Sequence, residues 1–280
     1  SALRILRRNP LRAGLTMLGI IIGIGAVVAM VSLGQGATAS VQAEIASLGT
    51  NVMIIVPGAT TVGGVRGGLG SISTLTVDDA EDIRTKVGSV TTVIYGSRSV
   101  LQVIHENKNW STVVVGTTPE FPDVRSWPIA QGNFFTQSDM DSAAKVVVLG
   151  KTAAQNLFEP GEEMVGAEIR IRNTPLRVIG ILAPKGQSIS GQDQDDLVVL
   201  PFSTAERKVL GTKFLGTVGI ILVATQTRYE IPAVVADIKE LLRARHHLPA
   251  QEEDDFTIRT MEDIANTIAG TSRTMMLMLM

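Results

Sequence analysis

Apolar positions are most concentrated near the start of the chain. From Ala13 to Leu33 nearly every residue is apolar or glycine, and no charged residue occurs between Arg12 and Glu44. A run of that length is enough for a membrane-spanning helix, which needs roughly 20 apolar residues. The alternative is a buried helix of a soluble protein, but such helices normally keep a polar face. The pattern therefore predicts a transmembrane helix over residues 13–33.

The helical pattern continues beyond the apolar run. Val41, Ile45 and Leu48 follow one another at spacings of four and three, which places them on one helix face. A helix over residues 11–48 would be about 55 Å long, and the hydrocarbon core of a bilayer takes about 30 Å of that. The pattern therefore predicts that residues 34–50 form a stalk outside the membrane. The two residues that oppose a continuous helix here are Gly34 and Gly36.

The charges before the apolar run indicate its orientation. All of them are basic, and basic flanks remain in the cytoplasm. We therefore expect residues 1–12 to be cytoplasmic and the chain after residue 33 to be extracytoplasmic. A cleaved signal peptide also begins with basic residues, but its apolar region is only about 7–15 residues long. The residues that determine this topology are Arg4, Arg7, Arg8 and Arg12.

Two glycines within the predicted span are candidates for helix packing. Gly19 and Gly23 are four residues apart, a spacing that lets a second membrane helix approach closely. Glycine is also simply common in membrane helices. Both interpretations stay open at this point.

After residue 50 the pattern changes to short apolar runs and alternating segments, separated by loops and by helices with capping motifs. This alternation predicts an α+β domain outside the membrane. The expected strands lie at 51–57, 89–104, 110–116, 145–149, 166–182 (a hairpin), 197–201, 215–224 and 256–260. The expected helices begin near Thr76, Thr136, Thr152, Ser203, Pro232 and Thr260.

Composition removes several classes of function. The chain of 280 residues has a net charge of −2 and contains no cysteine. The net charge gives no sign of the basic patch that nucleic-acid binding requires. The absence of cysteine excludes thiolate metal sites and cysteine nucleophiles. A hydrolase is disfavoured because no Gly-x-Ser-x-Gly motif occurs, although carboxylate pairs stay open. We expect no catalytic residue, no metal ligand and no cofactor in this chain.

Three local patterns suggest chemistry but are incomplete. Gly150-Lys151-Thr152 resembles the end of a phosphate-binding loop, but Lys145 stands where that motif requires glycine. An acidic loop could hold calcium, but it lacks the glycine and glutamate of an EF-hand, so a solvated loop is favoured. His105 is predicted to face solvent at a turn. The acidic loop contains Asp193, Asp195 and Asp196, and the remaining histidines, His246 and His247, are adjacent and cannot chelate one ion from a regular helix.

Several stretches resemble one family of transport proteins. They run from Arg7 to Val28, from Leu33 to Ala37 and from Leu48 to Gly58, and together they are similar to the start of a MacB-type ABC transporter permease. The segments Leu75-Thr-Val-Asp-Asp-Ala and Gly132-Asn-Phe-Phe also match that pattern. The resemblance covers essentially the whole chain and is strongest over residues 7–58.

The resemblance implies a two-part extracytoplasmic domain. A porter-like subdomain would comprise residues 51–118 and 214–262, and a Sabre-like subdomain would be inserted at 119–213. Residues 263–280 would form a second stalk and the beginning of a second transmembrane helix. The apolar end of the chain, from Thr274 to Met280, independently suggests such a span. The chain would then be a fragment.

The resemblance also implies a function. Permeases of this family work as dimers in the bacterial inner membrane, and ATP hydrolysis by an ABC ATPase moves the outer domain, a mechanism called mechanotransmission. Members export macrolides, peptides, toxins or siderophores, often with a periplasmic adaptor and an outer-membrane channel. No ATPase motif occurs in this chain, so ATP would bind a separate domain or subunit. The alternatives are a lipoprotein-releasing-type permease and a membrane-anchored binding or scaffold protein.

Overall fold

The computed structural model describes most of the chain after residue 50. The described residues are 51–58, 61–62, 65–66, 74–188, 191–211 and 215–264, together with residues 11, 14–26, 28, 32, 36, 266–267 and 270. The chain divides into two compact units, one formed by residues 1–44 and 265–280 and the other by residues 45–264. Each unit is described by itself.

The first unit contains a helix over residues 14–26. Its large apolar side chains are exposed, including Leu15 at 68% and Ile21 at 66%. Among the described residues, no helix reaches the length and apolarity that a membrane crossing needs. The predicted span at 13–33 includes residues outside the described part of the chain. The predicted segments at 1–12 and 34–50 lie almost entirely outside it as well, and of the predicted segment at 263–280 only residues 263–264, 266–267 and 270 are described.

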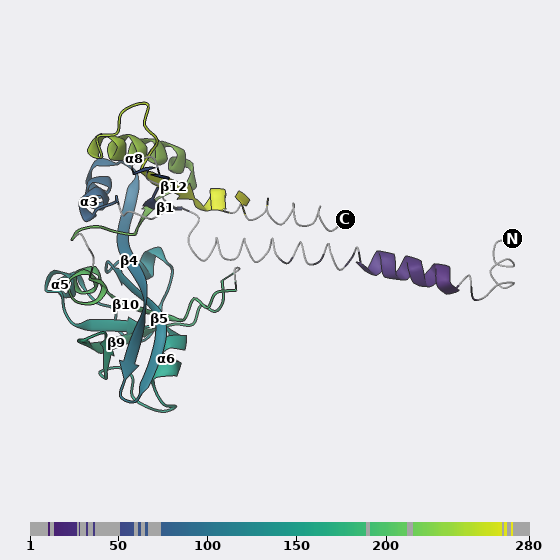
Figure 1. Cartoon of the computed structure of the whole chain (residues 1–280), viewed down its shortest axis with the longest axis horizontal. Helices are drawn as coiled ribbons and strands as arrows, with labels where there is room; N and C mark the ends of the chain where they lie inside the picture. The colour runs from purple at the N-terminus through teal and green to yellow at the C-terminus, as the bar shows by residue number, and fades with distance from the viewer. Residues whose placement is uncertain are drawn as a thin grey trace. The chain divides into compact units, whose positions relative to one another are not determined.

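The second unit is built around one long strand, β4 (Val90–His105). The first half of β4 is the last strand of an open antiparallel sheet with the order β12-β1-β11-β4. Two helices cover one face of this sheet (Figure 1). The elements are β1 (Val52–Pro57), β11 (Ile220–Thr225), β12 (Phe256–Thr260), α3 (Val77–Lys86) and α8 (Ile231–Arg245).

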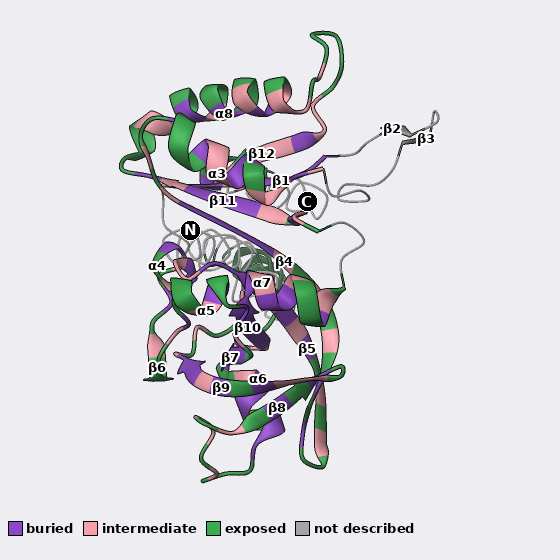
Figure 2. Ribbon diagram, turned by 90° about the vertical axis from the view of Figure 1, so that its left-hand side faces the viewer, coloured by how far each residue is buried: buried purple, intermediate pink, exposed green. Residues whose placement is uncertain are grey.

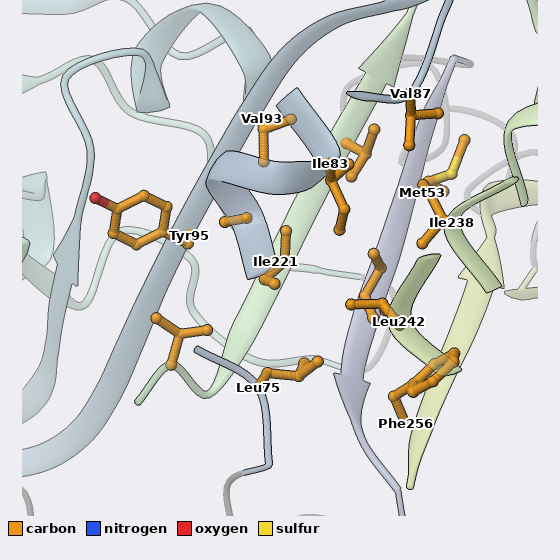
Figure 3. Packing of buried hydrophobic residues seen from close by; sticks show 14 of the residues in the cluster. Met53, Leu75, Ile83, Val87, Val93, Tyr95, Ile221, Ile238, Leu242 and Phe256 are labelled. Carbon is orange, nitrogen blue, oxygen red and sulfur yellow. The ribbon is translucent and has the colours of Figure 1, made fainter. Parts of the chain in front are cut away.

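Periodicity explains why these helices pack there. The buried residues of α8, Val234, Ile238 and Leu242, recur every four positions and form one apolar face. They meet the inward side chains of the sheet, among them Met53 and Ile221, in the first hydrophobic cluster (Figure 3). The opposite face of α8 is exposed (Figure 2).

The second half of β4 belongs to a closed circuit of strands. From β4 the pairing runs through β5, β10, β7, β9 and β8, and β8 pairs again with β4. A strand circuit of this kind leaves few free edges. The elements are β5 (Lys108–Thr117), β7 (Val146–Leu149), β8 (Glu168–Ile171), β9 (Thr174–Leu182) and β10 (Leu197–Pro201), with β6 (Ile129–Gly132) on the outer side of β9.

Short helices complete this part of the unit. The helix α6 (Lys151–Leu157) packs against the circuit in a second hydrophobic cluster. A third cluster joins the open sheet to the strand circuit, because it combines side chains of β1 and β11 with side chains of β7, β9 and β10. The remaining elements are β2 (Thr61–Val62), β3 (Val65–Arg66), α4 (Phe121–Val124), α5 (Gln137–Asp141), α7 (Phe202–Thr204), the π-helix η1 (Ala205–Leu210) and the 3₁₀ helix η2 (Arg228–Glu230).

A glycine marks the point where β4 passes from the open sheet to the circuit. Gly96 pairs with Ile220 of β11 on one side and with Thr117 of β5 on the other. A Cβ atom at Gly96 would overlap the carbonyl oxygen of Gly116. Any larger residue at position 96 would therefore push the two central strands apart.

The sequence predicted most of these elements, but two of its expectations differ from the structure. The strand expected at 215–224 begins only at Ile220, and Leu215 is exposed in the preceding turn. The hairpin expected to turn at Asn173-Thr174-Pro175 instead turns at Arg172-Asn173, because Arg172 adopts a positive φ of 53°. Thr174 and Pro175 are therefore part of β9.

Candidate functional site

Two neighbouring strands connect the second unit to the rest of the chain. The strand β1 begins just after the chain enters this unit, and β12 ends just before it leaves. They are antiparallel neighbours, and Met53 lies opposite Thr260. The entry and the exit of the chain therefore lie side by side at one end of the sheet. We call this end, formed by residues 51–53 and 260–264, the chain junction.

Buried side chains anchor the chain junction. Val52 is 4% exposed and Met261 is 2% exposed, and both belong to the third hydrophobic cluster. Ile264 packs against the same cluster, which also contains Phe121 of α4. The third cluster also contains side chains of β7, β9 and β10, so the buried residues of the chain junction share one packed core with the strand circuit.

Polar contacts hold the same residues. The backbone nitrogen of Thr225 donates to the carbonyl oxygen of Asn51 (3.0 Å), and the side chain of Asn51 donates to the carbonyl oxygen of Gln226 (2.9 Å). At the exit, the Thr260 hydroxyl donates to the Asp263 carboxylate (2.7 Å), and the Asp263 nitrogen donates back to that hydroxyl (3.1 Å). These reciprocal bonds form a capping box, so a helix follows β12 without an intervening loop. Hydrogen bonds from Thr260 also lower the pKa of the Asp263 carboxyl.

An ionic cluster holds the opposite end of the β1–β12 pair. His246, the residue that caps α8, lies between two carboxylates: its Nδ1 is 2.7 Å from Asp255 and its Nε2 is 3.2 Å from Asp79. The Nε of Arg245 donates to Asp79 (2.6 Å), and its guanidinium also pairs with Asp82. The cluster thus ties α3 and α8 to the residue that precedes β12.

The electrostatics of this cluster follow from burial and pairing. Burial alone would raise the pKa of Asp79, which is 2% exposed, but hydrogen bonds from His246, Arg245 and Thr76 outweigh it and the pKa is lowered. The hydrogen bond with Asp79 raises the pKa of His246, although burial opposes it. A neutral imidazole can donate from only one nitrogen. His246 is therefore favoured as a cation.

A surface cleft of about 530 Å³ lies on the outer face of the strand circuit. Arg98 and Val100 of β4 line one side, and Val113 of β5 lies beside them. The loop before β10 contributes Asp193 and Asp196. The cleft therefore combines both signs of charge with an apolar floor.

The structure places the residues that the sequence singled out as follows. Gly19 and Gly23 are exposed on the helix at 14–26, and a Cβ atom at either would meet no neighbouring atom within 4 Å. The packing role of these glycines stays a prediction. The topology residues, Arg4, Arg7, Arg8 and Arg12, lie outside the described residues.

One histidine prediction was wrong. His105 is 7% exposed, and its ring nitrogens lie 2.8 Å from the carbonyl oxygen of Glu168 and 2.8 Å from the carboxylate of Glu162. It also contacts Phe158, with a centroid distance of 4.1 Å. The alternation along β4 could have indicated this, because His105 follows the buried Val103 by two positions.

The acidic segments are also more ordered than expected. The run Glu252-Glu-Asp-Asp255, whose composition predicts a solvated loop, ends in two paired carboxylates. Asp254 accepts ion pairs from Lys239 (2.8 Å) and Arg243, and Asp255 binds His246. In the other loop, Asp195 is buried and accepts backbone N–H groups of Lys185 and Gly186. The carboxylates of Asp254, Asp255 and Asp195 therefore stabilise turns and helix contacts.

Comparison with known proteins identifies the family. The family model described as the MacB-like periplasmic core domain matches residues 13–241. The chain belongs to this family. Among its relatives are proteins named macrolide export ATP-binding/permease protein MacB from Syntrophobacter fumaroxidans (35% identity, covering 98% of this chain and 46% of the relative) and from Azoarcus sp. (36% identity, 100% and 40%). The chain thus spans less than half the length of these MacB relatives.

Solved structures agree with this assignment. The periplasmic region of MacB from Actinobacillus actinomycetemcomitans matches with a TM-score of 0.66 and 26% identity, covering 81% of this chain and 97% of that structure. The extracellular domain of the ABC-type transporter YknZ from Gram-positive bacteria matches with a TM-score of 0.60 and 16% identity, covering 75% of this chain and all of that structure. The second match shows a shared fold alone. The second unit therefore has the fold of a MacB periplasmic core domain.

The sequence did not predict the chain junction or the ionic cluster. Met261 and Val52 are ordinary apolar residues, and only the pairing of β1 with β12 brings them together. Asp79 was recognised as a capping residue, and the capping box is present. No residue near Asp79 in the sequence indicates that its carboxylate contacts His246, which lies 167 positions away.

Proposed function

We propose that this chain is the periplasmic part of a MacB-type export permease, and that it transmits movement from a partner ATPase to the outer domain. Residues 13–33 would cross the inner membrane with the N-terminus in the cytoplasm. Residues 34–50 and 263–280 would be the two stalks, and the latter would lead into a second span. The observation that supports this best is the chain junction, where the entry and the exit of the second unit meet in one buried cluster.

The position of the third cluster explains how movement would pass outward. Val52 and Met261 pack together with residues of β4 and β11, and the same cluster includes Val148 of β7 and Val199 of β10. Packed interiors resist continuous deformation. A shift of the two stalks would therefore move the circuit of strands as one body with the sheet.

We further propose that the second unit comprises the two subdomains implied by the family. The porter-like part would be residues 51–118 and 214–262, and the Sabre-like insert would be residues 119–213. The first hydrophobic cluster lies almost wholly in the former and the second largely in the latter. Partners of the intact protein would be an ABC ATPase, a second permease copy, and, where present, a periplasmic adaptor and an outer-membrane channel. The chain itself would perform no catalysis.

Topology and partnership can be tested in one preparation. Because the chain has no cysteine, one cysteine at Tyr229, which is 86% exposed, is a unique labelling site. In intact cells the site should react with a membrane-impermeant maleimide applied from outside the inner membrane, whereas a cysteine at Ser1 should react only after lysis. The permease should also co-purify with an ATPase whose hydrolysis supports export. Labelling of Ser1→Cys in intact cells would contradict the topology, and export unaffected by a Walker-lysine substitution in the ATPase would contradict the function.

A further inference from the structure

The strand register sets the relative positions of the residues that line the cleft on the strand circuit. Arg98 and Val100 lie on β4, and Val100 is paired with Val113 of β5. On the other side of β5, Val113 is paired with Leu197, the first residue of β10. Asp196 directly precedes that strand. Arg98 is paired with Val115, two residues further along β5. Arg98 and Asp196 therefore belong to chain segments on opposite sides of β5 and at different positions along it.

Both carboxylates are held in place but keep free acceptor capacity. The indole nitrogen of Trp110 donates to Asp196 (2.8 Å), and the hydroxyl of Thr152 donates to Asp193 (2.7 Å). The second oxygen of Asp193 accepts the backbone nitrogen of Asp195 (2.9 Å). An ionised carboxylate can accept about four hydrogen bonds. Within the described part of the chain, neither Asp193 nor Asp196 is ion-paired with a lysine or arginine.

The floor between the charges is apolar and only partly covered by the chain. Val100 is 66% exposed although it lies in the middle of a long strand. Val113 beside it is only partly buried. A ligand body over these two side chains would remove apolar surface from water, and the cleft volume is within the range of about 300–1,000 Å³ typical of small-molecule sites.

We propose that this cleft binds an amphipathic cation. An amine or guanidinium of the ligand is held by Asp193 and Asp196, and its apolar body covers Val113 and Val100. Arg98 on the far side repels a second positive charge, so the site takes a monocation and rejects polyamines. This site does not depend on the proposed transport function, because all of its residues belong to the surface of the second unit.

The test uses the whole chain in lipid nanodiscs, with empty nanodiscs as the reference for partitioning. The probes are 4-phenylbutylamine, its neutral analogue 4-phenylbutanol, its anionic analogue 4-phenylbutyrate, and spermidine. Binding is followed by ligand-observed NMR and by tryptophan emission, to which Trp110, in contact with Asp196, contributes together with Trp127. The amine should bind saturably, and the other three probes should bind at least tenfold more weakly. Equal binding of the alcohol and the amine, or no saturable binding of the amine, would overturn the proposal.

Matched variants locate the site. Asp193→Asn and Asp196→Asn keep an acceptor oxygen but remove the charge, and each should weaken amine binding at least tenfold. Arg98→Gln should leave amine binding intact or strengthen it and should admit spermidine. Asp123→Asn, an exposed carboxylate outside the cleft, is the control. Amine binding that is the same in the two cleft variants as in the control would show that the amine binds elsewhere.

Discussion

The Nδ1 atom of His246 lies 2.7 Å from the carboxylate of Asp255, at the point where α8 ends and β12 is about to begin. The Nε2 atom faces Asp79, so the ring is held from both sides by negative charge. The other charged groups around it are Arg245, which pairs with Asp79, and Asp82, which pairs with Arg245. The contact joins α3, α8 and the strand that leads to the chain junction.

This arrangement predicts a pH-dependent stability. The pKa of His246 is raised above its ordinary value of 6.5, so the stabilisation is complete below that value and is lost as the pH rises through the folded-state pKa. The Tm of the unaltered chain should therefore fall more steeply between pH 6 and pH 9 than the Tm of His246→Asn. His247→Asn is the matched control and should follow the unaltered chain. If the Tm of His246→Asn fell with pH as steeply as the Tm of the unaltered chain, this account would be contradicted.

The capping box at the exit offers a second prediction. Thr260→Ala removes a hydrogen bond at the start of the helix and should cost about 1 kcal/mol of unfolding free energy. Thr136→Ala removes the equivalent bond of α5, where Thr136 and Asp139 form the same capping box. Both variants should lose similar stability in chemical denaturation, but only Thr260→Ala should reduce export per ATP hydrolysed. Equal export by the two variants would show that the cap at the exit has no role in coupling.

The central glycine of β4 gives a third prediction. Gly96→Ala places a methyl group against the carbonyl oxygen of Gly116. Because that oxygen belongs to the backbone of the neighbouring strand, it cannot move aside as a flexible side chain could. Such overpacking costs about 1–3 kcal/mol. Gly88→Ala is the control, because a Cβ atom at Gly88 would meet no neighbour within 4 Å. Denaturation midpoints should separate the two variants, and equal midpoints would show that the strands tolerate the added group.

The parts of the fold that were predictable are those with local causes. The capping boxes at Thr76, Thr136 and Thr260 are present because each threonine and its aspartate are three residues apart. Gly150 also has a local role, because it is the N-cap residue of α6 and a Cβ atom there would overlap the backbone of Asp195.

The remaining features depend on contacts between distant segments. The register that sets Met53 opposite Thr260 joins positions about two hundred residues apart, and sequence periodicity carries no information on such a pairing. The burial of His105 depends on Glu162 and Phe158, which lie more than 50 positions further along the chain. For the same reason the chain junction and the cleft became visible only in the folded chain.

The most direct test of the account compares two buried methionines in the intact transporter. Met261 lies at the chain junction in the third hydrophobic cluster, whereas Met140 lies in α5 at 7% exposure and belongs to the first cluster. Replacing either by alanine removes a similar buried side chain and should cost about 2–5 kcal/mol. The measurement is export per ATP hydrolysed at a temperature where both variants are folded. The account predicts that Met261→Ala hydrolyses ATP but exports poorly, while Met140→Ala remains coupled; equal coupling in both variants would contradict it.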